Sequence, residues 1–287
     1  WISKIEAVLS TGATQIILPP HRRPLYGFYK DNDLKKLSSA YTWMANAGHF
    51  TPSCDTLHNI PLFTPSNMKQ TSHRQKEHYF NRYWFKKIFT DSIIITSPLT
   101  HADEGAANTI RLSNQSLNIG LTIYVESHSK SKYPSRQSNQ GFNELVTRHK
   151  IKHSFILKQH KYAMDAGVFH NDVISFGFKD KLFCHVDSFE DQANKIDQLK
   201  LRYKTIFKHP LTVIEINSIS LKDAVDTYLF NSQVIINNNH HTLICPTTVK
   251  ENTKTHSIIK QWQNNGHFDS IIFIYQYTTI TVTFCIY

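Results

Sequence analysis

Cysteine is scarce in this chain, and the few cysteines that occur are far apart. The four are Cys54, Cys184, Cys245 and Cys285 among 287 residues, and no two of them form a Cys-x-x-Cys pair. Disulfide scaffolds and structural zinc sites both need closely spaced cysteines. The sequence therefore excludes a disulfide-dense secreted scaffold and predicts reduced thiols in a cytoplasmic protein.

Long hydrophobic runs are also missing. The longest cover residues 93–95 and 271–275, far short of the roughly 18 residues that a membrane-spanning helix needs. No segment rich in Gly, Ser or Pro divides the chain as a linker would. No export signal is read at Trp1, a start that we expect to be internal to a longer protein. These features predict a single globular domain over residues 1–287 without membrane contact.

Positive charge exceeds negative charge. The chain has 32 Lys and Arg against 22 Asp and Glu, a net charge of +10, which raises the hypothesis of a nucleic-acid-binding module. The basic residues are scattered, whereas a nucleic-acid surface needs them in a stripe or patch. We therefore expect no nucleic-acid partner, and salt-dependent binding to arbitrary duplex DNA would be needed to revive that hypothesis.

Seventeen histidines raise the question of a metal site. The candidates are the adjacent His240 and His241 and the trio His153, His160 and His170. None of them falls in an HExxH or similarly spaced motif, and single histidines are more often surface or hydrogen-bonded structural residues. We expect no metal site.

Helical and strand patterns alternate along the chain. A helix at residues 2–9 and a strand at 15–18 are followed by the same pair at 144–150 and 153–157, at 189–202 and 211–216, and at 257–262 and 271–275. This alternation predicts an α/β protein, and the recurrence predicts internal symmetry. The polar stretches 49–72 and 127–140 are predicted to be long loops, where functional sites usually lie.

Four of the predicted loop segments combine small residues with acid, imidazole, amide or guanidinium groups. They are residues 43–47, 103–108, 133–137 and 165–172. Small neighbours let backbone and ligand approach closely, while Glu, His and Asp transfer protons and bind cations. Simpler explanations remain open, because Asp-Glu-Gly can be a turn or helix start and Phe-His-Asn-Asp can cap a helix.

Taken together and in order, these segments resemble the motifs of the succinylarginine dihydrolase family. The matches are Met-Ala-Asn-Ala (44–47), Pro-Ser-Cys-Asp-Thr (52–56), His-Arg (73–74), Asp-Glu-Gly-Ala-Ala-Asn (103–108) with Arg-Leu (111–112), Tyr-Pro-Ser-Arg-Gln (133–137), residues 165–174, and Tyr-Leu-Phe-Asn-Ser-Gln (228–233). The resemblance covers nearly the whole chain. The combination of Gly-Val-Phe-His-Asn-Asp-Val with Tyr-Leu-Phe-Asn-Ser-Gln makes it specific.

The resemblance implies both a fold and a reaction. The fold is the pentein fold, a five-bladed α/β propeller with pseudo-fivefold repeats, here truncated or altered at both ends of residues 1–287. The reaction converts N2-succinylarginine to N2-succinylornithine, carbon dioxide and two ammonia molecules through a cysteine nucleophile, and it uses no cofactor. The implied partner is a small-molecule substrate, and a homodimer is left open.

The resemblance also implies roles for individual residues. Glu104 and His170 match the family's catalytic acid/base residues, and Asp172 matches a substrate-binding aspartate. A guanidinium is planar and always protonated, so carboxylates suit its recognition. The other substrate-binding positions match Asn46, His73, Arg74 and Arg136. Arginine side chains can bind the carboxylates of the substrate as bidentate forks, and we predict that Arg74 and Arg136 line one cavity with Glu104, His170 and Asp172.

The match fails near the C-terminal end. The family's nucleophile lies in an Asn-Gly-Gly-Gly-Pro-Ala-Cys segment after a strand, whereas residues 276–285 contain no glycine and many β-branched residues. Such a run is typical of a buried strand, in which Cys285 would be inert. We expect that Cys285 is not the nucleophile, and an alternative is a catalytically inactive pentein-fold fragment that at most binds succinylarginine. Ala102 and Thr109, beside Glu104, replace a family glycine and histidine.

Overall fold

A computed structural model describes residues 2–16, 44–71, 74–114, 116, 118–128, 130–133 and 135–275. The α-helices are α1 (Ile2–Ser10), α2 (Glu77–Phe89), α3 (Asn139–His149), α4 (Lys161–Asp165), α5 (Gln192–Phe207), α6 (Leu221–Thr227), α7 (Thr247–Glu251) and α8 (Thr253–Asn264). The strands are β1 (Gly48–Thr51), β2 (Leu62–Pro65), β3 (Ile94–Ile95), β4 (Thr109–Ser113), β5 (Gly120–Glu126), β6 (Ser154–Lys158), β7 (Ser175–Phe178), β8 (Lys181–His185), β9 (Thr212–Ile216), β10 (Gln233–Asn237), β11 (His240–Pro246) and β12 (Ser270–Ile274). No helix in this part of the chain is long and apolar enough to cross a membrane.

The described residues contain four units of the same topology. Each begins with a short 3-10 helix, continues through an antiparallel strand pair and a helix, and ends with a third strand parallel to the second. Unit 1 spans residues 44–95, unit 2 spans 105–158, unit 3 spans 171–216 and unit 4 spans 229–274. Because parallel neighbours cannot be joined by a tight turn, a helix crosses over between the second and third strands.

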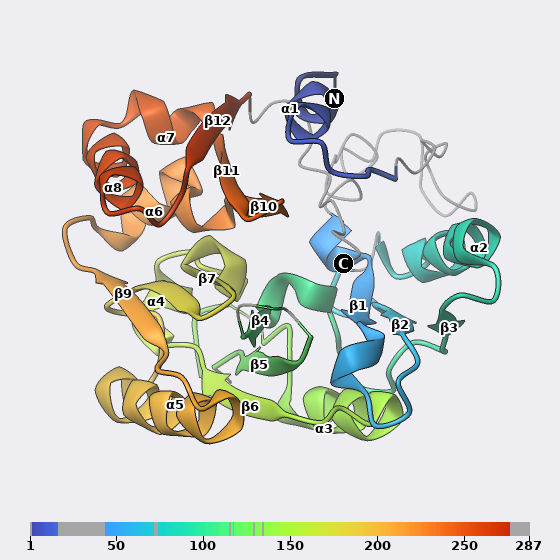
Figure 1. Cartoon of the computed structure of the whole chain (residues 1–287). Helices are drawn as coiled ribbons and strands as arrows, with labels where there is room; N and C mark the ends of the chain where they lie inside the picture. The colour runs from blue at the N-terminus through green and yellow to red at the C-terminus, as the bar shows by residue number, and fades with distance from the viewer. Residues whose placement is uncertain are drawn as a thin grey trace, which may run out of the picture.

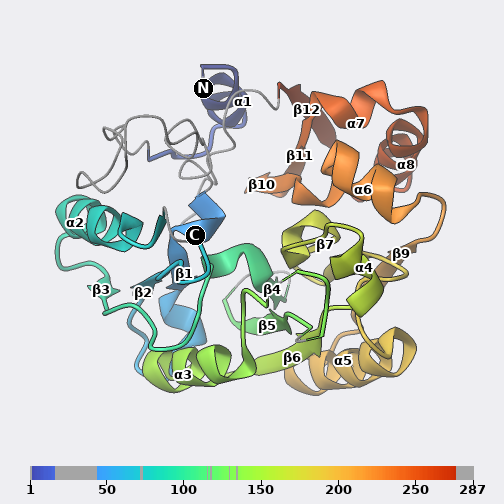
Figure 2. The same cartoon turned by 180° about the vertical axis from the view of Figure 1, so that it is seen from behind.

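The four units follow one another around the molecule, with their crossover helices α2, α3, α5 and α8 on the outside (Figure 1). The view from behind in Figure 2 shows the same order. On the inside, β4 of unit 2 contacts β7 of unit 3. Gly177 permits this approach, because a Cβ there would lie 2.7 Å from the side chains of Ile110 and Leu112. The 3-10 helices that precede the first strands of successive units also contact one another.

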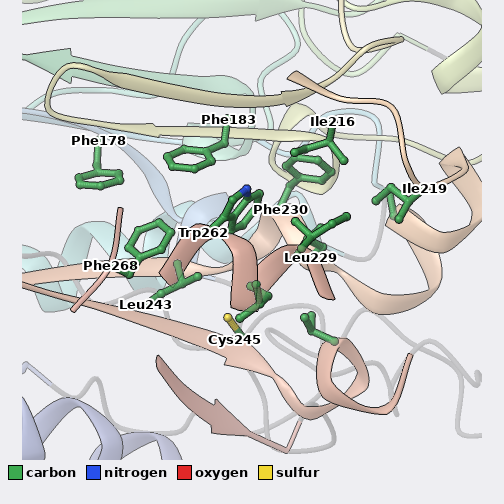
Figure 3. Close-up of a cluster of buried hydrophobic side chains, with 14 residues drawn as sticks. Phe178, Phe183, Ile216, Ile219, Leu229, Phe230, Leu243, Cys245, Trp262 and Phe268 are labelled. Atoms are coloured by element: carbon green, nitrogen blue, oxygen red, sulfur yellow. The ribbon is translucent and has the colours of Figure 1, made fainter. Parts of the chain in front are cut away.

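Units 3 and 4 share a buried aromatic cluster (Figure 3). The ring of Trp262 on α8 lies 4.8 Å, centroid to centroid, from that of Phe183 on β8. Phe178 on β7 and Phe268 before β12 have ring centroids 5.4 Å apart. Each such ring removes a large apolar area from water and prefers edge or offset contacts, so the cluster fixes unit 4 against unit 3.

The predicted alternation of helices and strands is confirmed for most of its members. The helices predicted at residues 2–9, 144–150, 189–202 and 257–262 overlap α1, α3, α5 and α8, and the strands predicted at 153–157, 211–216 and 271–275 overlap β6, β9 and β12. The four units of equal topology also confirm the predicted internal symmetry.

The prediction of a long loop over residues 49–72 was wrong. This stretch contributes to β1 and contains β2, which pair as the hairpin of unit 1. Its polar side chains are compatible with burial because they are hydrogen-bonded: His149 of α3 lies 2.7 Å from the hydroxyls of both Thr51 and Thr64. The strand predicted at 15–18 is not formed at residues 15 and 16, and residues 17 and 18 lie outside the described residues.

Candidate active site

Glu104 lies where unit 2 begins, immediately before the 3-10 helix η7 (Gly105–Asn108), and is completely buried. Its backbone is fixed on both sides. The amide N–H donates to Oε1 of Gln137 at 3.1 Å, and the carbonyl accepts from Nδ2 of Asn46 at 2.7 Å. These two bonds come from unit 1 and from the loop after β5. The backbone position of Glu104 is thus fixed by other segments of the chain.

A glycine and an aspartate shape the backbone beside Glu104. Gly105 has φ +81°, and a Cβ there would lie 2.5 Å from the carbonyl oxygen of Ala45, so the close approach of units 1 and 2 requires glycine. Oδ1 of buried Asp103 accepts three hydrogen bonds, from the N–H of Gly105 (3.1 Å), Nε2 of His49 (2.7 Å) and Nε2 of Gln137 (3.0 Å). The Asp-Glu-Gly segment therefore is a helix start, since Gly105 is the first residue of η7.

The carboxylate of Glu104 joins three other segments of the chain. Oε2 lies 2.6 Å from Nε2 of His170 and 3.1 Å from Nη1 of Arg136, while Oε1 accepts from the hydroxyl of Thr71 at 2.9 Å. Glu104 and His170 occupy the N-cap positions of the 3-10 helices that follow them, but neither side chain makes a capping hydrogen bond. The structure therefore favours the chemical explanation of these two side chains over the capping explanation.

Arg136 lies in the loop between β5 and α3. Its guanidinium stacks on the ring of Phe169, 5.0 Å from the centroid, and the edge of Tyr133 meets that ring with centroids 4.9 Å apart. A planar guanidinium over an aromatic face is held in one orientation. Nε of Arg136 is buried and has no hydrogen-bond partner among the described residues, so this donor is available to an incoming acceptor.

The two carboxylates of the site differ in their pKa. Burial raises the pKa of Glu104, but the hydrogen bond and charge of His170, followed by the charge of Arg136, outweigh burial and lower it to about 2. Burial raises the pKa of Asp172 to about 6, because the charge of His170 and a hydrogen bond with Asn231 offset only part of the desolvation. Asp172 as a whole residue is part-buried, while its carboxyl is held away from water. The pKa of Glu104 is thus held low by its neighbours, whereas the pKa of Asp172 stays raised despite the charge of His170.

Two further predicted site residues, Asn46 and Arg74, have defined hydrogen-bond partners, and a third, His73, is not described. Asn46 joins the Glu104 cluster, and its Oδ1 accepts from Nη1 of Arg74 at 3.2 Å. Arg74 is almost completely buried and pairs with Glu77 at 2.8 Å, so Glu77 fixes the orientation of its guanidinium. His73 lies outside the described residues.

Several contributors to the site were not predicted from the sequence. They are Thr71, Gln137, Phe169 and Asn231. All but Thr71 lie inside the motifs that carry the family resemblance, which was the available signal. Nothing in the sequence marks Thr71 beyond its position two residues before His73.

The other motif residues include a structural pair. Arg111 on β4 binds Asp55 through two bonds, Nε to Oδ2 at 2.6 Å and Nη2 to Oδ1 at 2.9 Å. This bidentate pair is partly shielded from water, and its geometry is that of the stronger ion pairs in proteins. It joins unit 2 to the β1–β2 connection of unit 1.

The cysteines that the structure describes are not activated thiols. Burial raises the pKa of Cys245 to about 12 and also raises the pKa of Cys184 well above its usual range. Burial and the neighbouring charge of Asp55 raise the pKa of Cys54. A catalytic cysteine needs a lowered pKa. Cys285 lies outside the described residues.

The histidines do not form a metal site in the part of the chain that the structure describes. No group of three or more His, Cys, Asp and Glu side chains there is arranged to hold an ion. The contacts of His170 are instead those of an acid/base residue paired with a carboxylate.

Known proteins match most of this sequence. The model of the succinylarginine dihydrolase family matches residues 32–274. The chain is 31% identical to the N-succinylarginine dihydrolase of Legionella pneumophila, covering 90% of this chain and 66% of that protein. It is 28% identical to N-succinylarginine dihydrolase 2 of Caulobacter vibrioides, covering 90% of this chain and 65% of that protein. The chain thus spans about two thirds of the length of these curated relatives.

Two solved structures share the fold at low sequence identity. The DDAH of Pseudomonas aeruginosa, a mutant complexed with citrulline, has a TM-score of 0.52 at 11% identity, covering 85% of this chain and 73% of that chain. An amidinotransferase from Microseira wollei has a TM-score of 0.52 at 14% identity, covering 84% of this chain and 66% of that chain. At this identity the likeness concerns the α/β fold of small sheets alone. The family match over residues 32–274 is far more specific, and by it this chain belongs to the succinylarginine dihydrolase family.

Proposed function

We propose that this chain binds N2-succinylarginine and hydrolyses its guanidinium group, giving N2-succinylornithine, carbon dioxide and two ammonia molecules. The observation that carries the proposal is the contact between Glu104 and His170 at 2.6 Å, formed by residues 66 positions apart in a chain of this family. A buried carboxylate beside an imidazole can hold a cationic planar group and move protons to and from it.

Recognition of the guanidinium falls to the two carboxylates. Asp172 carries a pKa raised to about 6 and gains most from an incoming cation, because a positive charge would offset its desolvation. Glu104 is already anionic, with a pKa of about 2. His170 contacts Glu104 by a hydrogen bond and lies two residues before Asp172 in the sequence. It transfers protons to the departing ammonia and from water.

Recognition of the opposite end of the substrate falls to donors. The succinyl and α-carboxyl groups are anions, and Arg136, Arg74, Asn46 and His73 supply hydrogen bonds to them. The buried, unpartnered Nε of Arg136 supports this assignment, because a bidentate fork to a carboxylate uses Nε together with one terminal nitrogen.

A second candidate function is binding of succinylarginine without turnover. The chemistry needs a thiolate that attacks the guanidinium carbon, and the described cysteines Cys54, Cys184 and Cys245 all have raised pKa values. Cys285 is the remaining cysteine, and its apolar sequence context predicts that it does not attack.

An ammonia-release assay on the purified chain separates the two functions. Incubation with N2-succinylarginine is compared between the wild type and Cys285→Ala, with ligand binding measured in parallel. Turnover that Cys285→Ala abolishes establishes hydrolysis and refutes our prediction about Cys285. Binding without ammonia release in both proteins establishes the second function, and absence of binding refutes both.

The remaining expectations follow the same resemblance. We infer that the four described units belong to a five-bladed pentein propeller, folded as a single domain over residues 1–287. The reaction consumes only water besides the substrate, so no cofactor is expected. A homodimer and a cytoplasmic location stay predictions.

A further inference from the structure

Two of the four 3-10 helices that begin the units carry an asparagine whose side chain bonds to a neighbouring unit or to the residue just before it. From η4 (Met44–Asn46), the Asn46 side chain donates to the backbone carbonyl of Glu104, just before η7. From η7, the Asn108 side chain accepts from the N–H of Asn171. Each bond therefore reaches a residue of the candidate site or a residue next to it.

Asn108 holds the chain between His170 and Asp172. It is completely buried, and its Oδ1 accepts from the N–H of Asn171 at 2.9 Å. Asn171 is the single residue between the two site residues, so this bond anchors the backbone between them at the His170–Asn171 peptide. The side chain of Asn171 accepts from the hydroxyl of Ser175, at 2.6 Å, within the same unit. The bond to Asn108 thus ties the backbone of this segment to η7, directly after Glu104.

We propose that Asn108 is a positioning residue for guanidinium recognition, which holds the segment of His170 and Asp172 in register with Glu104. The inference rests on the proposed function, because it assigns Asn108 to the guanidinium end of the same substrate. Asn108 acts through the backbone of Asn171, so it does not need to touch the substrate.

The position of this bond distinguishes positioning from general stability. Strand β4 of unit 2 already contacts β7 of unit 3. The two units therefore stay together without the Asn108 bond, and the effect of losing that bond is expected at the site. A buried hydrogen bond placed at a unit boundary fixes direction, which apolar packing does not do.

The test compares two ligands that differ only in the guanidinium group. Binding of N2-succinylarginine and N2-succinylornithine is measured by calorimetry for the wild type, Asn108→Ala, Asn108→Asp and the surface control Asn143→Ala. We expect Asn108→Ala to weaken binding of N2-succinylarginine at least tenfold and to leave N2-succinylornithine within about threefold of the wild type. Asn108→Asp keeps the acceptor oxygen and should restore the wild-type affinity. Equal weakening of both ligands, or no weakening of either, overturns the proposal.

A second measurement does not depend on ligand binding. The Nε2–H proton of His170, hydrogen-bonded to Glu104, is followed by NMR and assigned by its loss in Glu104→Gln. The proton signal should disappear in Asn108→Ala and persist in Asn108→Asp and Asn143→Ala. If wild-type protein binds neither ligand, the proposed function fails, while this signal still decides the positioning role. A signal unchanged in Asn108→Ala refutes that role for Asn108.

Discussion

Asp172 has an unusually high pKa for an aspartate. Burial raises its pKa from an ordinary value of 3.8 to about 6. A bound guanidinium would favour the charged form and lower that pKa. Binding and loss of the Asp172 proton are then linked, so affinity rises with pH up to about 6 and levels off above it. Glu104, with a pKa of about 2, stays ionised across this range.

The first prediction follows from that linkage. Between pH 6 and pH 5 the dissociation constant for N2-succinylarginine should increase by up to about tenfold, the limit for one linked proton. Calorimetric titrations across this range measure it. Asp172→Asn should bind N2-succinylarginine weakly and lose the part of the pH dependence that comes from Asp172. Any pH dependence that survives in this variant belongs to another group. An affinity of the wild type that is flat from pH 7 to pH 5 contradicts the pKa of Asp172.

Arg136 provides a second residue-level prediction. Arg136→Lys keeps the charge but loses the fork and the flat contact with Phe169. Binding of N2-succinylarginine should weaken by about 1.5–3 kcal/mol, the scale of a hydrogen bond to a charged group. The matched control is Lys132→Arg in the same loop, which should change the affinity little. Equal affinities of the wild type and Arg136→Lys would remove Arg136 from the list of substrate contacts.

At the scale of elements, the 3-10 helices position the residues of the candidate site, since Glu104 and His170 each directly precede one. Each has three or four residues, too few to be stable on its own hydrogen bonds. Their positions therefore depend on contacts with neighbouring units, such as the bond from Asn46 to the Glu104 carbonyl. The candidate site is consequently a property of how units meet.

Gly105 tests this dependence. Gly105→Ala adds a methyl group 2.5 Å from the carbonyl of Ala45 at φ +81°, while Gly266→Ala has a similar φ of +71° and no atom within 4 Å. The unfavourable φ alone should cost on the order of 1 kcal/mol in both variants. Urea unfolding should show a larger decrease in the free energy of unfolding for Gly105→Ala than for Gly266→Ala. Gly105→Ala should also lose binding of N2-succinylarginine, whereas Gly266→Ala should keep it. Equal effects of the two substitutions would show that the approach of units 1 and 2 is not critical.

At the scale of the whole molecule, the sequence predicted the crossover parts of units 2, 3 and 4 but not α2 and β3 of unit 1, and it predicted no hairpin. Helices α3, α5 and α8 and the strands that follow them have clear apolar periodicity, which is a local signal. The β1–β2 hairpin was missed because its buried Thr51 and Thr64 are satisfied by His149 from another unit. A partner 98 residues from Thr51 and 85 residues from Thr64 leaves no trace in a local window.

The site shows the same division between local and distant information. Motif resemblance assigned Glu104, His170, Asp172, Asn46 and both arginines, but no spacing rule relates Glu104 to a histidine 66 residues away. The structure also adds what motifs do not contain: the three hydrogen bonds that Asp103 accepts and the two that the Asn46 amide makes. These bonds depend on how unit 1 meets the start of unit 2, which is information about the fold.

The central claim is that Glu104 holds the guanidinium of N2-succinylarginine. The most direct measurement is calorimetric binding of N2-succinylarginine and of free arginine to the wild type and to Glu104→Gln. The account predicts that the wild type prefers N2-succinylarginine, because only that ligand also carries a succinyl carboxylate for the arginine side chains. It further predicts that Glu104→Gln weakens binding of N2-succinylarginine by at least about tenfold, since a neutral amide replaces the anion. Unchanged affinity in Glu104→Gln, or equal affinities of the wild type for the two ligands, would contradict the account.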